Sequence, residues 1–260
     1  MTNGSTPVLG VQHRQFSVSG KVEWMLPEEA PIALVYNRRT FAVMMASPAD
    51  LIEFGLGFSL AEQIIEKPSE LHDIEVLRLD EGLAVNMTIP SSRAAALIGR
   101  RRNLEGRSGC GLCGIESLAA LRRPLPRVSS PRVLPSAIES ALTELMVHQP
   151  MRSVNHSVHG AGWCDLNGRI LLAREDVGRH TALDKLLGAA CRLPSFPHDG
   201  FVVISSRCGY ELVSKSAAMG IGLLVSVSAP TTMALSMARQ AGMTLASCAR
   251  GSGIIIFDSM

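Results

Sequence analysis

Hydrophobic and polar positions follow one pattern in the first hundred residues of the chain and another in the second half. The first part carries short β-prone runs around a single apolar stretch. We predict strands over 32–36, 41–45, 74–79 and 83–89, a hairpin turn at 37–39, and one helix from Asp50 to Ile65. Asp50 and Glu53 have the spacing of a capping box at the start of that helix. We therefore expect a small α+β unit over 28–105, preceded by a polar tail over 1–27.

The second half alternates regularly between strands and helices. Predicted strands cover 160–164, 170–173, 201–205, 223–227, 244–248 and 254–257, and predicted helices cover 136–148, 181–192, 210–219 and 231–241. Ser136 and Glu139 match a second capping box. Continuously apolar strands that alternate with helices are typical of a largely parallel sheet covered on both faces. The expected fold class is therefore α/β, with one larger domain over 135–260.

A third segment, 106–134, separates these parts and shows no hydrophobic period. It is rich in glycine, proline and arginine, which is typical of a flexible loop. Between residues 91 and 132 the chain has nine arginines, no lysine and two glutamates, a net charge of +7, although the whole chain carries only +2. Cys110 and Cys113 stand in this segment at C-x-x-C spacing. A positive field favours thiolate over thiol and attracts anions, so we predict that both cysteines are reactive and meet a negatively charged partner.

Composition limits the classes of protein to which the chain can belong. The 260 residues are 47% hydrophobic and 18% charged, as in a folded chain large enough for two structural units. A polar N-terminus, and no apolar run of about eighteen residues, predict a cytoplasmic protein without membrane insertion. A net charge of +2 with 4% aromatic residues does not favour a nucleic-acid partner.

Six scattered cysteines are too few for a disulfide framework in a chain of this length. For Cys110 and Cys113, reactive thiols are the favoured interpretation and a zinc site is the alternative. A tetrahedral zinc site needs about two more cysteine or histidine ligands, and the sequence has no second C-x-x-C pair. The other four cysteines are interpreted as small hydrophobic residues, although Cys208 lies on a candidate ligand turn.

Small hydroxyl residues and arginines gather where predicted strands end and helices begin. Ser205 and Arg207 follow one strand, Ser228 follows the next, and Arg250 lies in the turn after a third. Free backbone N–H groups and the helix dipole favour anions at this edge of such a sheet. Helix capping explains the hydroxyl groups without a ligand, but it does not explain the two guanidinium groups. We therefore predict a site for the phosphate groups of a nucleotide-like ligand.

A dense run of ionisable residues, Arg174-Glu175-Asp176-Val177-Gly178-Arg179-His180, comes just before a predicted helix. It has two interpretations: a ligand site, or a helix N-terminus at which Asp176 balances the helix dipole and the arginines pair with neighbouring acids. His156 and His159 precede a predicted strand and are candidates for metal binding or proton transfer. Isolated histidines are more often structural, so both interpretations stay open.

Together these segments resemble the formate dehydrogenase accessory sulfur carriers, the FdhD family. Four motifs carry the resemblance: Arg107-Ser108-Gly109-Cys110-Gly111-Leu112-Cys113-Gly114, the run from Arg174 to Lys185, Ser205-Ser206-Arg207 with Tyr210-Glu211-Leu212-Val213, and Val227-Ser228-Ala229-Pro230. They occur in the family's order and cover about residues 28 to 258. The Arg-Glu-Asp-Val-Gly-Arg-His block is long and specific.

The resemblance implies a cytoplasmic, dimeric sulfur carrier whose C-terminal domain is similar to the cytidine deaminase fold. Such a protein accepts persulfide sulfur from a cysteine desulfurase and transfers it to the molybdenum cofactor, in its bis-molybdopterin guanine dinucleotide form, before insertion into formate dehydrogenase. By position, Cys110 would carry the persulfide and Cys113 would act beside it. The strand-end segment would contact the cofactor, or a guanine nucleotide such as GDP: Cys248, Ala249, Arg250, Gly251, Ser252 and Gly253. The other candidate cofactor contacts are Ser205, Arg207, Ser228, Arg179, His180 and His159.

Two other functions stay open. A zinc-dependent nucleoside deaminase would share the implied fold, but its chemistry needs H-x-E together with P-C-x-x-C. Here Gly109 precedes Cys110 and no H-x-E occurs. A chaperone that binds the nucleotide-bearing cofactor without sulfur transfer is the stronger alternative. Under that function the two cysteines would be replaceable, whereas Arg207 and Arg250 would not.

Overall fold

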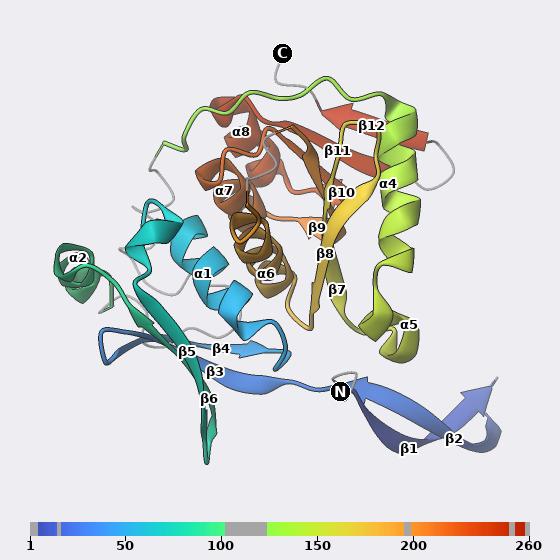
Figure 1. Ribbon diagram of the computed structural model, residues 1–260. Helices are drawn as coiled ribbons and strands as arrows, with labels where there is room; N and C mark the ends of the chain where they lie inside the picture. Colours follow the sequence, from blue (N-terminus) through green and yellow to red (C-terminus); the bar gives the residue numbers. More distant parts are fainter. Residues whose placement is uncertain (1–4, 15–16, 102–123, 195–198, 250–252, 258–260) are drawn as a thin grey trace.

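The computed structural model describes residues 5–14, 17–101, 124–194, 199–249 and 253–257. The chain forms a four-stranded sheet, a six-stranded sheet and a separate two-stranded hairpin. Figure 1 shows the four-stranded sheet and its helix beside the larger sheet, with the hairpin extending away from both. Within the described ranges, no helix is both long and apolar enough to cross a membrane.

The four-stranded sheet contains β3 (Ala30–Tyr36), β4 (Arg39–Ala46), β5 (Asp73–Leu79) and β6 (Gly82–Thr88) in the order β4-β3-β6-β5. The predicted hairpin between β3 and β4 is confirmed. Its turn residues Asn37 and Arg38 have φ values of 47° and 67°, the left-handed conformation that a two-residue hairpin turn requires. Helix α1 (Leu51–Ala61) buries Phe54 against Ile32 and Leu34 of the sheet. The predicted α+β elements are therefore present.

Both predicted capping boxes are wrong, although both helices exist. Asp50 has a left-handed backbone, with φ 53°, and its side chain makes no capping bond. Helix α1 ends at Ala61, not at Ile65, because Gln63 has a φ of 54°. Helix α4 (Pro135–Val147) begins one residue before the predicted cap, with Pro135 at a position where its missing N–H costs nothing. The spacing of apolar residues predicted that these helices exist. It placed the end of α1 too late, because buried apolar residues continue past the helix.

Several elements were not predicted. Strands β1 (Ser5–Arg14) and β2 (Ser17–Pro27) form an antiparallel hairpin where a polar tail was expected. Helix α2 (Ser91–Arg101), the short helix α5 (Pro150–Asn155) and the 3-10 turn η1 (Pro68–Glu70) were also missed. Pro7, Gly10 and Gly20 interrupt the β-prone residues of these strands, and such residues are depleted in strands, so the sequence pattern there is weak. The proposed domain boundaries remain predictions.

The six-stranded sheet has the order β12-β11-β10-β9-β7-β8. Its strands are β7 (His159–Cys164), β8 (Ile170–Asp176), β9 (Phe201–Cys208), β10 (Leu223–Pro230), β11 (Thr244–Ala249) and β12 (Gly253–Phe257). Only β9, β10 and β11 are mutually parallel, and the other pairings are antiparallel. The expectation of a largely parallel sheet is therefore wrong. Short connections join β7 to β8 and β11 to β12, and such connections allow only antiparallel pairing.

Helices cover both faces of this sheet, as predicted. On one face lie α6 (Arg179–Cys191), α7 (Tyr210–Ala218) and α8 (Thr232–Ala241), which share a core with the sheet. Helix α4 covers the other face, where Ile138 and Leu145 contact the sheet residues Phe201 and Val203 (Figure 1). Thr231 caps α8 by accepting a bond from the Ala234 N–H at 3.2 Å. The mixed α/β class is confirmed.

Helix α1 of the smaller unit packs directly on α6 of the larger one. Glycines allow the two backbones to touch: a Cβ atom on Gly57 would collide with the Asp184 carbonyl oxygen, and one on Gly188 with the Glu53 carbonyl oxygen. The contact is therefore backbone against backbone. It fixes the position of α6, whose first turn carries two of the predicted site residues.

Candidate functional site

The carboxyl ends of the parallel strands meet at one edge of the large sheet. Ser228 of β10 pairs in register with Arg207 of β9. Strand β7 runs antiparallel to β9, so its first residues lie at the same edge, where the Gly160 N–H donates to the Ser205 hydroxyl oxygen at 2.8 Å. The predicted site residues Ser205, Arg207 and Ser228 therefore lie together, with His159 next to them. They stand on extended strand ends, not on turns, because β9 and β10 are three residues longer than predicted.

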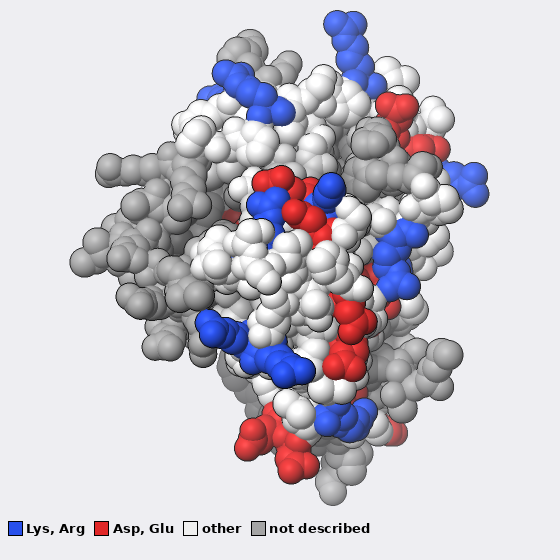
Figure 2. All heavy atoms as spheres, turned by 60° about the vertical axis from the view of Figure 1, so that its left-hand side comes forward, with Lys and Arg blue, Asp and Glu red and all other residues white. Residues whose placement is uncertain are grey.

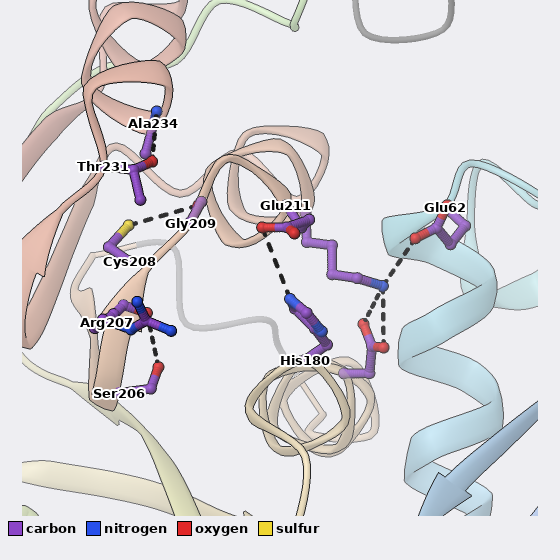
Figure 3. Close-up of polar contacts among 11 residues, drawn as sticks. Glu62, His180, Ser206, Arg207, Cys208, Gly209, Glu211, Thr231 and Ala234 are labelled. Atoms are coloured by element: carbon purple, nitrogen blue, oxygen red, sulfur yellow. Dashed lines mark hydrogen bonds and ion pairs between the residues drawn. The ribbon is translucent and has the colours of Figure 1, made fainter. Parts of the chain in front are cut away.

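The first turn of α6 adds Arg179 and His180 to this edge. The Nε2 atom of His180 lies 3.8 Å from a carboxylate oxygen of Glu211, at the start of α7. Figure 3 shows the imidazole ring directed at that carboxylate, between the two helices. Burial alone would raise the pKa of Glu211, but His180 and Arg179 reverse the effect and the pKa is lowered. Glu211 is therefore an anion within a cluster that is otherwise cationic or neutral.

His159, the first residue of β7, is a partly buried site residue with a titratable side chain. Its Nδ1 atom is buried and has no hydrogen-bond partner among the described residues. Burial lowers the pKa of His159, and the positive charges of Arg179, Arg152 and His180 lower it further. The imidazole is therefore neutral at neutral pH, with an unused ring nitrogen beside several positive groups.

The ionisable run from Arg174 to His180 spans two elements, the end of β8 and the start of α6. Its first residues belong to β8, not to a turn before a helix. The Glu175 carboxylate accepts the backbone N–H groups of Met151 and Arg152, at 2.7 and 2.9 Å, and so caps the first turn of α5. Only Arg179 and His180, at the end of the run, face the site. Asp176, which the capping interpretation placed at the helix start, accepts the Gly178 N–H at 2.8 Å directly before α6. The cap that Glu175 provides for α5 was not expected.

Asp176 and Lys185 form a fully buried ion pair, with 2.6 Å between Nζ and Oδ2. Ser47 completes the group: its N–H donates to Asp176 at 3.0 Å and its carbonyl accepts from Lys185 at 2.9 Å. Its hydroxyl also accepts the Val177 N–H at 3.2 Å. We call these three residues the Ser47 clasp, because it joins the end of β4 to β8 and α6.

A second buried ion pair lies one helical turn below His180. Lys215 of α7 donates to both oxygens of Asp184, at 2.9 and 3.0 Å, and lies 3.0 Å from Glu62 (Figure 3). Its ammonium group also lies 4.9 Å from the centre of the Phe58 ring. Burial alone would lower the pKa of Lys215, but the two carboxylates outweigh it and the pKa is raised. This pair joins α6, α7 and the end of α1.

Ser47 and Glu62 were not predicted as site residues, and Glu211 appeared only as part of a motif. For Glu211 a signal existed, since it is an acid in the first turn of a helix that follows a candidate ligand turn. Ser47 and Glu62 carry no local signal, because their partners come from distant parts of the chain. Arg207 is exposed at the end of β9, so it is available to a ligand.

The remaining predicted site residues lie in or next to segments that the structure does not describe. Cys110, Cys113, Arg250, Gly251 and Ser252 lie outside the described residues. Cys248 is an exposed free thiol on β11, opposite Ile254, and Ala249 ends that strand. Gly253 begins β12 with a φ of 78°, a conformation that favours glycine.

The environment of Cys208 argues against a role in ligand binding. Cys208 is buried, and burial raises the pKa of its thiol to about 12. Cys164 is also buried. Both behave as small hydrophobic residues, as predicted. Among the described residues, no group of three or more His, Cys, Asp or Glu side chains could hold a metal ion.

Charged side chains are mixed on the face shown in Figure 2. Among the described residues visible there, lysines and arginines alternate with aspartates and glutamates in small groups between uncharged areas.

Comparisons with known proteins agree with the motifs. A family model described as the FdhD/NarQ family matches residues 27–260. A protein of Xanthomonas campestris pv. campestris (strain B100) named sulfur carrier protein FdhD is 46% identical over 241 residues, covering 92% of this chain and 86% of that protein. A protein of the same name from Bordetella petrii is 43% identical over 232 residues, covering 89% of this chain and 84% of that protein.

A crystal structure from Desulfotalea psychrophila, of a protein assigned as a formate dehydrogenase accessory protein, aligns with a TM-score of 0.76 at 25% identity. The alignment covers 98% of this chain and 96% of the Desulfotalea psychrophila chain, so the similarity extends over both sheets. The resemblance seen in the sequence motifs is thus confirmed by sequence and by fold. The chain belongs to the FdhD/NarQ family.

Proposed function

We propose that the protein is a sulfur carrier and an accessory factor of formate dehydrogenase. It accepts persulfide sulfur from a cysteine desulfurase and transfers it to the molybdenum cofactor, in its bis-molybdopterin guanine dinucleotide form, before insertion into the dehydrogenase. Relatives at 43–46% identity are named sulfur carrier protein FdhD, and the similar solved structure is of a protein assigned as a formate dehydrogenase accessory protein. The C-x-x-C pair supplies the thiols that such a carrier needs.

Loading of the carrier is a thiol exchange. The thiolate of Cys110 attacks the outer sulfur of the desulfurase persulfide, so one S–S bond forms on Cys110 as the S–S bond of the desulfurase breaks. The desulfurase cysteine leaves as a thiolate, and no net oxidation occurs. The many arginines of residues 91–132 favour the attacking thiolate. Cys113 stands close enough in sequence to take part in the later release of the sulfur.

The carboxyl edge of the large sheet is the proposed site for the cofactor, which is the substrate of the carrier. The observation that supports this most directly is the convergence of Arg179, Arg207 and the unpartnered His159 at one edge. Ser205, Ser228 and His180 lie beside them, and the segment 248–253 continues from the neighbouring strand. Guanidinium groups, and strand-end hydroxyls that can still donate their proton, suit the diphosphates of a guanine dinucleotide.

Three further properties belong to the same proposal. The mixed sheet with helices on both faces supports a C-terminal domain related to the cytidine deaminase fold. A homodimer and a cytoplasmic location are expected from the resemblance to the family. Sedimentation of the purified protein tests the dimer directly.

Mass spectrometry tests the carrier function. Reduced protein is incubated with a cysteine desulfurase and cysteine and then alkylated without reductant. A gain of one sulfur on the peptide containing Cys110 and Cys113, absent without desulfurase and lost in Cys110→Ala, supports the proposal. Absence of that gain, in a protein that still binds GDP, favours a chaperone that binds the cofactor without carrying sulfur.

A further inference from the structure

Strand β12 forms one lateral side of the six-stranded sheet, next to α4 (Figure 1). Its inner side is fully paired with β11, from Gly253 opposite Ala249 to Phe257 opposite Leu245. On its outer side, no described residue bonds to the main-chain N–H and C=O groups. Every second residue of an antiparallel outer strand presents both groups, so β12 is a template for one more strand.

The sequence of β12 lacks the features that usually prevent such pairing. Outer strands are commonly protected by charged side chains or by proline. The other three outer strands of the two larger sheets follow this rule, since β4 carries Arg39, β5 carries Asp73 and β8 carries Arg174. Strand β12 has the sequence Gly-Ile-Ile-Ile-Phe, with no charge and no proline. Its outer side is therefore open to a partner strand.

Apolar side chains are half-exposed on both faces of β12. Ile255 and Ile256 are each 44% exposed, and successive residues of a strand point to opposite faces. Ile254, on the same face as Ile256, packs on the core beneath α4. Phe257, on the same face as Ile255, packs on the core of the opposite face. An added strand with apolar side chains would therefore cover exposed isoleucine surface on each face.

An acidic side chain marks the start of β12. A Cβ atom on Gly253 would lie 3.8 Å from a carboxylate oxygen of Glu139, which is exposed on α4 and has no ion pair among the described residues. This charge favours a basic residue at that end of the added strand. A second copy of the chain does not match, because its own β12 has no basic residue to offer. The complementary partner is therefore a segment of another protein.

We propose that β12 is the docking strand for the recipient dehydrogenase, which adds an extended, apolar segment with a basic residue near Gly253. The inference rests on the proposed function and names the surface by which the carrier meets its client. The segment 248–252, which directly precedes β12, belongs to the proposed cofactor site, so a strand added there lies beside the point of cofactor transfer. In such contacts the main-chain bonds provide affinity and the alternating side chains provide selectivity.

Hydrogen exchange tests the inference on the full-length protein, alone and with the cofactor-free formate dehydrogenase from the same organism. Backbone amides that enter main-chain bonds exchange more slowly. We therefore expect the β12 amides to be slowed in the complex, while those of β8 exchange at the same rate as in the free protein.

A matched pair of variants tests the strand itself. Ile256→Lys places a charge in the proposed contact, and we expect it to weaken the complex by about tenfold or more. Leu171→Lys is the control, because Leu171 is 47% exposed on β8, the outer strand at the opposite side of the same sheet. This control is expected to leave the affinity for the dehydrogenase unchanged. Calorimetric titration measures both affinities.

Four outcomes overturn the inference: no complex, a complex in which β12 is not slowed, equal weakening by both variants, or slowing of β12 that rises with the concentration of the carrier alone. The last outcome would mean that two copies of the chain pair through β12. If Ile256→Lys does not fold, Glu139→Lys replaces it, and a weaker complex is again expected. Sulfur loading of Cys110 is independent of these measurements. Sulfur gain without docking at β12 leaves the carrier function intact, whereas docking without sulfur gain removes the carrier function and leaves the docking strand.

Discussion

Single cysteines of this protein differ in reactivity because they differ in exposure. Cys248 is exposed, whereas Cys164 and Cys208 are buried. Burial raises the pKa of Cys208 to about 12, so at pH 8 only about one in ten thousand of these thiols is ionised. We expect iodoacetamide to label Cys248 in the native protein and to spare Cys164 and Cys208 until denaturant is added. Peptide mapping by mass spectrometry gives the result, and rapid native labelling of Cys208 would contradict the burial described above.

The buried ammonium group of Lys215 is predicted to be essential for stability. Lys215→Met keeps the length of the side chain but leaves Asp184 as a buried carboxylate without its partner. Breaking a buried pair from one side costs about 3–5 kcal/mol. The free energy of unfolding from urea titration measures the loss.

Arg93 provides the matched control for Lys215. It pairs with two glutamates, Glu66 and Glu70, as Lys215 pairs with two acids, but it does so at the surface. Water screens such a pair, so Arg93→Met is expected to change stability little. Equal losses in the two variants would show that burial does not decide the contribution.

Sequence alone identified those site residues whose neighbours in the chain already suggest a ligand. Arg207 and Ser228 follow apolar strands, and Arg179 and His180 open a helix, so local pattern was enough to select them. Glu211 and Ser47 belong to the site and the buried group only through contacts with residues on other elements. Ser47 and Asp176 lie 129 positions apart, and no local pattern encodes such a contact.

At the scale of elements, hydrophobic spacing located most helices and strands but not their ends or pairing directions. Helix α1 stops at Ala61 although the apolar pattern continues to the buried Ile65. Burial continues beyond the helix because the chain after it still packs on the same core. The short connections from β7 to β8 and from β11 to β12 do imply antiparallel pairs. The antiparallel pairing of β7 with β9 depends on which edge of the sheet β7 joins, and no local pattern encodes that choice.

The α1–α6 crossing is the element contact most sensitive to a small change. Gly188→Ala would place a methyl group against the Glu53 carbonyl oxygen, and neither backbone can move without shifting its helix. We expect a loss of about 3 kcal/mol, the upper end of the usual cost of overpacking. Thermal unfolding followed by circular dichroism measures it.

Gly55→Ala tests whether backbone contact is the cause. The same methyl group on α1 would meet only side-chain atoms, of Val85, Ile74 and Met87. These side chains can adjust, so a loss of about 1 kcal/mol is expected. If Gly55→Ala were as harmful as Gly188→Ala, close backbone approach would not be the reason.

At the scale of the molecule, the two sheets are predicted to unfold together. The Ser47 clasp, the Lys215 pair and the α1–α6 crossing all link the smaller unit to the larger one. Native-state hydrogen exchange read by mass spectrometry should therefore give similar opening free energies for β6 and β9. A markedly lower value for β6 would mean that the smaller unit opens independently.

The Ser47 clasp also bears on the order in which the protein folds. Closing a loop of 129 residues is slow, because chain entropy is lost before the contact can form. On the ribosome, the partner strand β8 emerges long after β4 has been made. Until then the apolar surface of α1 lacks the helix that will cover it, so the nascent chain is a natural client for a chaperone. Arg179 follows Asp176 by three residues, and Ser205, Arg207 and Ser228 are synthesised later still, so the candidate site is completed only when most of the chain has been made.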